Sequence, residues 1–172
     1  LPADGTAVDL CTGSGAIAVV MRSARPAASV IATDVDPVAV ACARRNGVEA
    51  LLGDLDEPLP LSLRERVQVV NEDAFVWIEE TTEQPYDSAI LDFPDPNTFA
   101  LGKLYTKRFY SMLKSRLTAN AAVSVQSTSP MFARNSYWCI IRTIEAAGFT
   151  VKPYYTAVPS FGLWGYALAR SS

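Results

Sequence analysis

Short apolar runs alternate with segments of helical periodicity along most of the chain. The runs predict strands, and each has an acidic residue at or beside its end: 6–10, 28–34, 48–54, 66–73 and 86–93. Between and after them, apolar residues return with helical spacing, which predicts helices over 16–24, 36–46, 74–80, 103–117 and 135–148. Strands that alternate with helices indicate a parallel sheet covered on both faces.

The last third of the chain adds further strands. Residues 121–127 predict one, and 150–158 and 163–170 predict an antiparallel pair around a Pro-Ser-Phe-Gly turn. We therefore expect an α/β fold, with a doubly wound, mostly parallel Rossmann-like sheet that ends in an antiparallel hairpin. The chain is expected to form one domain over 1–172. Its nucleoside-binding half would cover 1–60 and its catalytic half 61–172.

The acids at the ends of the predicted strands are the first candidate functional residues. Carboxyl ends of parallel strands meet at one edge of a sheet, where doubly wound folds bind ligands, so these acids are expected to lie together. They are Asp9, Asp34, Asp54, Asp73 and Asp92.

The first strand leads directly into a glycine-bearing turn, Cys-Thr-Gly-Ser-Gly. Gly13 and Gly15 would let a ligand approach the backbone, and Asp34 follows at the interval typical of a carboxylate that binds ribose hydroxyls. The spacing alone does not separate a nicotinamide dinucleotide from S-adenosylmethionine. An apolar residue at the third glycine position, Ala18 or Val19, favours S-adenosylmethionine.

Composition narrows the function classes. Apolar residues make up 49% and charged residues 19% of the 172 residues, and the net charge of −3 gives no reason to expect a nucleic-acid partner. No apolar run is long enough for a membrane span, and three widely spaced cysteines suit a cytoplasmic protein without disulfides or a metal site. The chain has no histidine, so proton transfer would fall to Asp, Glu, Tyr, Lys or Cys.

The glycine turn, the segment 32–50 and Leu-Leu-Gly-Asp at 51–54 carry a first family resemblance. Over residues 6–60 they resemble the cofactor-binding half of the release-factor glutamine N5-methyltransferases. The resemblance implies a sheet of the S-adenosylmethionine-dependent methyltransferase type, with Asp54 near the adenine. The remaining expected cofactor-binding residues of this half are Asp9, Gly13, Ser14, Gly15 and Asp34. The Asn-Pro-Pro-Tyr motif of that family does not occur in the sequence, so its glutamine substrate is not expected.

A second set of motifs lies in the other half. Asp-Phe-Pro-Asp-Pro at 92–96 is followed by Leu-Tyr at 104–105, Phe-Tyr at 109–110 and Gln-Ser-Thr-Ser-Pro at 126–130. Over residues 66–170 the chain resembles the spermidine synthases, also called polyamine aminopropyltransferases. The resemblance implies transfer of an aminopropyl group from decarboxylated S-adenosylmethionine to a diamine such as putrescine, without a metal.

This resemblance also implies residue roles. An amine must lose a proton before it attacks, and a neighbouring carboxylate can hold and accept that proton. Asp92 would be this acid/base and Asp95 would anchor an ammonium group, although both could instead only cap the turn. The predicted contacts to adenine and diamine are Asp73, Ala74, Gln126 and Tyr105. The helix predicted over 103–117 places Tyr105, Phe109 and Leu117 on one face, and Tyr105, Phe109 and Tyr110 are also expected to be core residues.

Two departures from the spermidine synthases leave other functions open. Their glycine turn carries an aspartate where this chain has Ser14. An acid there would repel the carboxylate of intact S-adenosylmethionine, so Ser14 leaves an S-adenosylmethionine-dependent methyltransferase as an alternative. The small β-rich segment of that family is not found before the first predicted strand, which leaves a nucleoside-binding domain with a degraded active site as a third reading.

The two resemblances meet near residues 60–67. Both 48–54 and 66–73 predict the third strand, and only one of them can take that position. We expect one of the two at an edge of the sheet, or an irregular segment over 54–66. The sequence also leaves open a homodimer.

Overall fold

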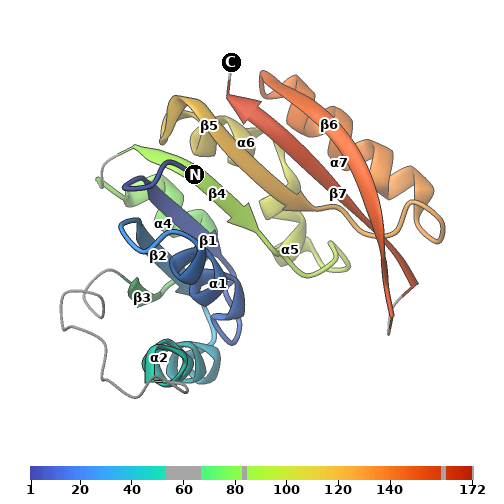
Figure 1. Ribbon diagram of the computed structural model, residues 1–172. Helices are drawn as coiled ribbons and strands as arrows, with labels where there is room; N and C mark the ends of the chain where they lie inside the picture. Colours follow the sequence, from blue (N-terminus) through green and yellow to red (C-terminus); the bar gives the residue numbers. More distant parts are fainter. Residues whose placement is uncertain (53–66, 83–84, 160–161, 172) are drawn as a thin grey trace.

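The computed structural model describes residues 1–52, 67–82, 85–159 and 162–171. In these ranges seven strands form one sheet in the order β3-β2-β1-β4-β5-β7-β6 (Figure 1). The first five strands in this order, β3, β2, β1, β4 and β5, run parallel to one another. Strand β7 is antiparallel to both of its neighbours, β5 and β6. In sheet order the strands are β3 (Val67–Asn71), β2 (Ser29–Asp34), β1 (Thr6–Leu10), β4 (Tyr86–Leu91), β5 (Leu117–Gln126), β7 (Gly162–Ser171) and β6 (Phe149–Val158).

Helices lie on both faces of this sheet. Helices α1 (Ala16–Ala24) and α2 (Pro37–Leu52) cover one face near β1 and β2, and α4 (Ala74–Glu80), α6 (Lys107–Ser115) and α7 (Arg134–Ala146) cover the other (Figure 1). The short α5 (Phe99–Gly102) and the 3₁₀ turn η1 (Lys103–Tyr105) connect β4 to α6. The doubly wound sheet with a C-terminal antiparallel hairpin is therefore confirmed.

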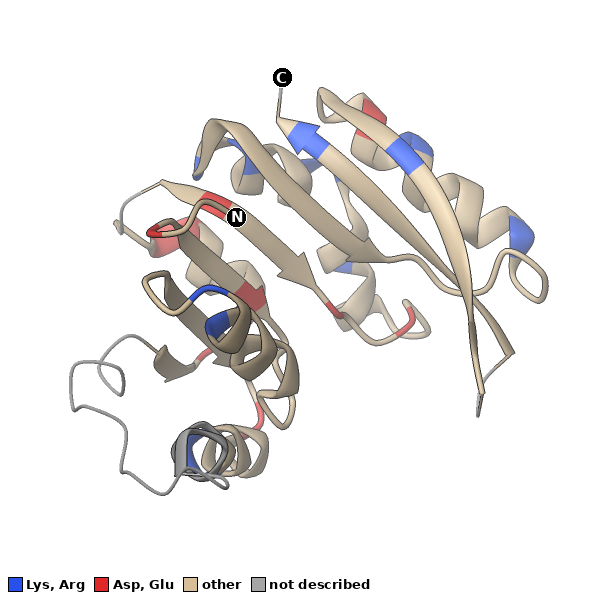
Figure 2. Cartoon of the chain, in the orientation of Figure 1, with Lys and Arg blue, Asp and Glu red and all other residues tan. Residues whose placement is uncertain are grey.

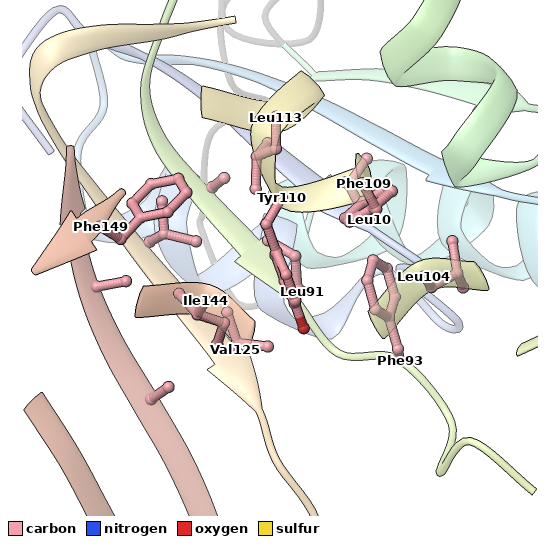
Figure 3. Packing of buried hydrophobic residues seen from close by; sticks show 14 of the residues in the cluster. Leu10, Leu91, Phe93, Leu104, Phe109, Tyr110, Leu113, Val125, Ile144 and Phe149 are labelled. Atoms are coloured by element: carbon pink, nitrogen blue, oxygen red, sulfur yellow. The ribbon is translucent and has the colours of Figure 1, made fainter. Parts of the chain in front are cut away.

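The larger hydrophobic core lies between the sheet and α4, α6 and α7 (Figure 3). Phe93 is fully buried and meets Tyr105 and Phe109 edge to face, with ring centroids 5.9 and 5.4 Å apart. Burying an aromatic side chain of this size contributes about 1.5–3 kcal/mol. The core position predicted for Tyr105, Phe109 and Tyr110 is confirmed, since all three side chains are buried.

The same core fixes the loop after β4. Leu91 and Phe93 are buried whereas Asp92 and Pro94 between and beyond them are exposed. This alternation continues the period of a strand past the last ladder hydrogen bonds. Because Phe93 is anchored in the aromatic cluster, Asp92 is turned outward at the edge of the sheet.

The prediction of a strand over 48–54 is wrong. Residues 48–52 continue α2, which the sequence predicts to end at Asn46, and residues 67–71 pair with β2 as the edge strand β3. A glycine inside a helix costs only about 1 kcal/mol, and the Glu, Ala and Leu that follow Gly47 are strong helix formers. Residues 53–66, including Asp54 and the segment expected to be irregular, lie outside the described residues.

The single helix expected over 103–117 is also wrong. Thr106 has an extended backbone, and its hydroxyl accepts a hydrogen bond from the Phe109 amide, so it caps a new helix at α6. Leu117, expected on the helical face, begins β5. Helix α1 and the closing hairpin lie where the sequence predicts them.

Candidate active site

A pocket of about 390 Å³ opens among the loops that follow β1, β2, β3 and β4. It lies where the strand order reverses between β1 and β4, the usual ligand position in doubly wound sheets. Its lining includes five of the predicted site residues: Gly13, Asp34, Asp73, Ala74 and Asp92. Leu101, Lys103 and Leu104 of α5 and η1 line it from the other side. In Figure 2, where Asp and Glu are red, acidic residues are visible in the loop that follows β4.

The glycine turn is shaped by two left-handed backbone positions. Gly13 has φ of 55° and Gly15 has φ of 80°. A Cβ on Gly15 would lie 2.9 Å from the Cβ of Ala43, so this glycine lets α2 pack against the turn. Among the described residues, no atom beyond its chain neighbours lies within 4 Å of a Cβ built on Gly13, which leaves its backbone open toward the pocket.

Asp34 is held in place by the backbone on both sides. Its Oδ2 accepts a hydrogen bond of 2.9 Å from the Gly13 amide, and its Oδ1 accepts one of 2.9 Å from the Asp36 amide. Each oxygen keeps a further lone pair. The carboxylate that lines the pocket is therefore preorganised to accept hydroxyl donors.

Asp9 and Ser14 lie away from the pocket lining. Asp9 is fully buried below the turn, where the Thr12 hydroxyl donates to its Oδ2 at 2.6 Å. Burial raises the pKa of Asp9 to about 6, opposed by the Thr12 hydrogen bond and assisted by the charge of Asp92. Ser14 is exposed, and its backbone carbonyl accepts a hydrogen bond from the side-chain amide of Asn46.

Asp73 combines a structural and a pocket position. Its Oδ1 caps the N-terminus of α4 by accepting from the Phe75 and Val76 amides. The ammonium of Lys103 lies 2.9 Å from both carboxylate oxygens. Burial alone would raise the pKa of Asp73, but the hydrogen bonds from Lys103 and the α4 amides bring it below its ordinary value. Sequence reasoning missed Lys103, because its pairing with Asp73 depends on the tertiary fold.

The two acids of the 92–96 turn have different surroundings. Burial raises the pKa of Asp92, which lines the pocket. Asp95 lies deeper, where its Oδ2 accepts from the Thr128 hydroxyl at 3.3 Å and its buried Oδ1 has no partner among the described residues. A turn-capping role alone does not account for either carboxylate, since neither has a turn amide among its described hydrogen bonds.

The side chain of Tyr105 contacts the backbone of this turn. Its hydroxyl lies 3.2 Å from the Phe93 carbonyl oxygen and 3.0 Å from that of Pro94. The predicted diamine contact of Tyr105 stays a prediction, because its described partners are these backbone carbonyls.

Gln126, at the end of β5, contacts the acid/base candidate directly. With its amide placed so that each polar atom meets a complementary partner, Nε2 donates to Asp92 Oδ1 at 2.6 Å and to the Phe93 carbonyl at 2.9 Å. Its Oε1 accepts from the Trp164 indole N–H at 2.9 Å. No signal in the sequence indicates this polar contact of Trp164, because its pairing with Gln126 depends on the tertiary fold.

A larger hollow of about 510 Å³ lies along α7, lined by Lys107, Trp138 and Arg142 among others. Its described lining includes none of the predicted site residues.

Within the described parts of the chain, no helix is both long and apolar enough to cross a membrane. No cluster of three or more potential metal-binding side chains was found in those same ranges.

Comparison with known proteins agrees with the second resemblance. The chain matches the Spermine/spermidine synthase domain over residues 26–172. It is 53% identical over 104 residues to a polyamine aminopropyltransferase of Leptospira interrogans, covering 60% of this chain and 21% of the relative. It is 38% identical over 157 residues to one of Oceanobacillus iheyensis, covering 91% of this chain and 30% of the relative. The chain thus spans about a fifth to a third of the length of these curated relatives.

Solved structures share the fold. A spermidine synthase in complex with the transition state analogue AdoDATO superposes with a TM-score of 0.76 at 21% identity, over 99% of this chain and 56% of that one. The likeness to glutamine methyltransferases over 6–60 is not among these findings and stays a prediction, and the family match from residue 26 onward spans the expected seam near 60–67. The chain belongs to the spermine/spermidine synthase family.

Proposed function

We propose that this chain carries the donor site and the acid/base group of a polyamine aminopropyltransferase. The observation that carries the proposal is the pocket at the switch in strand order, where Asp34, Asp73 and Asp92 come together in a member of this family. The donor would be decarboxylated S-adenosylmethionine and the acceptor a diamine such as putrescine. The related spermidine synthase was solved in complex with AdoDATO, a transition state analogue, and this complex supports the donor class.

The pocket walls suit the nucleoside of such a donor. Asp34, already oriented by two backbone amides, would accept hydrogen bonds from ribose hydroxyls. Asp73 and the buried Ala74 would border the adenine, where the carboxylate can accept from an exocyclic amine. Lys103 keeps Asp73 ionised and thereby available as an acceptor.

Asp92 would manage the proton of the transfer step. The acceptor nitrogen forms a new bond to the methylene carbon beside the sulfonium, the carbon–sulfur bond breaks, and its electron pair neutralises the sulfur. The nitrogen gives up its proton to Asp92, and methylthioadenosine leaves. Because partial burial at the pocket raises the pKa of Asp92, its carboxylate is a better proton acceptor than a fully solvated aspartate.

Asp95 would anchor an ammonium group. Its Oδ1 is buried without a partner among the described residues, and a bound cation would compensate the cost of burying it. Two carboxylates three positions apart, one lining the pocket and one recessed, can thus separate proton transfer from cation binding.

Ser14 leaves a second candidate, methyl transfer from intact S-adenosylmethionine, because no acid at this position would repel the donor's carboxylate. The two donors can be compared directly. We expect decarboxylated S-adenosylmethionine with putrescine to give spermidine and methylthioadenosine, and to bind more tightly than the intact donor. A preference for the intact donor would favour methyl transfer. Binding of methylthioadenosine without turnover of either donor would favour a nucleoside-binding domain.

The cytoplasmic location, the homodimer and the absence of nucleic-acid and membrane partners stay predictions.

A further inference from the structure

The amide of Gln126 has more partners than a residue needs for packing. Both of its N–H groups and its oxygen are engaged, with Asp92, the Phe93 carbonyl and Trp164 respectively. An amide offers only two donors and one oxygen acceptor, so this set leaves a single lone pair of Oε1 unused. Gln126 is therefore better placed to hold Asp92 than to bind a diamine.

We propose that Trp164 is a positioning residue for proton transfer, acting through Gln126. Its indole N–H holds Oε1 of Gln126 while Nε2 donates to Asp92 Oδ1 and the Phe93 carbonyl, so that the amide stays aligned with Asp92 and the other carboxylate oxygen is presented to the attacking amine. This inference rests on the proposed function, in which Asp92 is the acid/base.

Backbone pairing holds Trp164 at this place. The Gly165 carbonyl accepts from the Ser127 amide at 2.9 Å, and the Gly165 amide donates to the Thr128 carbonyl at 2.7 Å. These bonds tie β7 to the end of β5 directly beside Gln126. A Cβ on Gly165 would lie 2.5 Å from the Tyr137 ring, so the close approach requires glycine.

Loss of the indole N–H would change the protonation equilibrium of the Asp92 carboxylate. Without it, Oε1 loses its described partner, and the Gln126 amide, now held through Nε2 alone, can rotate away from its best geometry with Asp92. A lost hydrogen bond to a charged group destabilises the ionised form, and burial already disfavours that form. The Asp92 carboxylate would then take up a proton at a higher pH.

Other ionisable groups also face Asp92 or share its pocket. They come from β1 and its turn, β2, α4, η1, β7 and the loop of Asp92 itself: Asp9, Cys11, Asp34, Asp73, Lys103, Tyr105, Tyr166 and Asp95. None of these side chains is altered by Trp164→Phe. A change in the pH profile of that variant therefore reports on the Gln126 contact.

The kinetic test compares Trp164→Phe, which keeps the ring and removes the N–H, with Gln126→Leu, the double variant and the control Trp138→Phe. Trp138 lies exposed on α7, outside the network. We expect Trp164→Phe to lower kcat about tenfold with the KM for the donor within about twofold, and to move the acidic limb of the kcat/KM profile upward by about half a pH unit. The double variant should be no slower than Gln126→Leu alone, because Trp164 acts through Gln126. Fully additive losses with an unchanged pH profile would mean that Trp164 only packs, and would overturn the inference.

A second measurement needs no variant to be active. The chain has three tryptophans, so its indole N–H groups give three resolved signals in a ¹H–¹⁵N spectrum. The Trp164 signal should titrate with Asp92 in the parent protein and stop doing so in Asp92→Asn, whereas the Trp138 signal should not respond. A silent Trp164 signal in an active enzyme overturns the inference. A titrating signal in a protein without transfer activity upholds the network and overturns the proposed function instead.

Discussion

Asp92 and Asp95 are three positions apart on one proline-flanked turn, yet the core assigns them different surroundings. The buried Phe93 anchors the turn, which leaves Asp92 at the pocket and places Asp95 against Thr128. Two neighbouring carboxylates with different environments can take different roles. The turn thereby offers one acid for proton transfer and one for binding a cation.

Asp92→Asn tests the first of these roles. Asparagine keeps the shape of the side chain and removes the proton acceptor, so we expect kcat to fall about 10²–10⁴-fold with little change in the affinity for methylthioadenosine. Steady-state kinetics and calorimetry measure the two effects. Asp87→Asn is the matched control, because Asp87 lies at the opposite end of β4 and accepts from Thr6 and Thr118 there. Normal turnover in Asp92→Asn would remove Asp92 from the mechanism.

Activity should also depend on pH through Asp92. The proton acceptor must be ionised, and burial raises the pKa of Asp92 above its usual value of 3.8. The rate should therefore fall on acidification at a pH above that of an exposed aspartate, and recover as the pH rises. The kcat/KM profile of the parent protein measures this limb. A limb centred near pH 4 would show that Asp92 is solvated like a surface aspartate.

Asp9 gives a prediction about stability instead. Its folded pKa is about 6 against 3.8 when exposed, so the folded state keeps a proton that the unfolded chain has lost between these values. The resulting stabilisation is complete below about pH 4 and is lost as the pH rises through about 6. The asparagine of Asp9→Asn does not titrate, so between pH 4 and 7.5 this variant should gain about 2 kcal/mol relative to the parent. Denaturant unfolding at both pH values measures the difference, and parallel stability curves would contradict it.

At the scale of elements, local sequence signals decide some boundaries and tertiary pairing decides others. Helix α1 lies where the sequence predicts it, because Gly15 begins it and Pro26 follows its end. Two segments predict the edge strand, since 48–54 and 66–73 are both apolar and end in an acid. Only pairing with β2 distinguishes them, and that pairing depends on residues far apart in the chain.

Gly165 tests how β7 is held against β5. A Cβ there would lie 2.5 Å from Tyr137 and 2.7 Å from the Thr128 carbonyl, contacts that backbone and a packed ring cannot relieve cheaply. We expect Gly165→Ala to lower the free energy of unfolding by about 1–3 kcal/mol and to lower activity by displacing Trp164. Gly102→Ala is the control, because its backbone is helical and a Cβ built on it meets no atom of another described segment within 4 Å. Equal stability of the two variants in denaturant unfolding would show that the strands can separate without cost.

At the scale of the molecule, the sheet order explains why part of the site could be predicted. Asp34, Asp73 and Asp92 each follow a parallel strand, so any doubly wound arrangement of these strands brings their ends to one edge. Lys103 and Trp164 could not be found in this way. Lys103 reaches the pocket through η1, and Trp164 contacts Gln126 from an antiparallel strand that pairs with β5, so their positions follow from packing rather than from strand ends.

The pocket itself can be tested through the stability of the whole fold. A ligand that binds only the folded state stabilises it by about 2.7 kcal/mol at a hundredfold excess over its Kd, which for a domain of this size raises Tm by several degrees. Methylthioadenosine should produce this shift in the parent protein. Its 2′-deoxy analogue should produce a smaller one, because Asp34 then loses a hydroxyl donor while its bonds to Gly13 and Asp36 persist. Asp34→Asn should make the two ligands more nearly equivalent, since an amide accepts through one oxygen only. Equal shifts from both ligands in the parent protein would mean that Asp34 serves the glycine turn alone and that the ribose lies elsewhere.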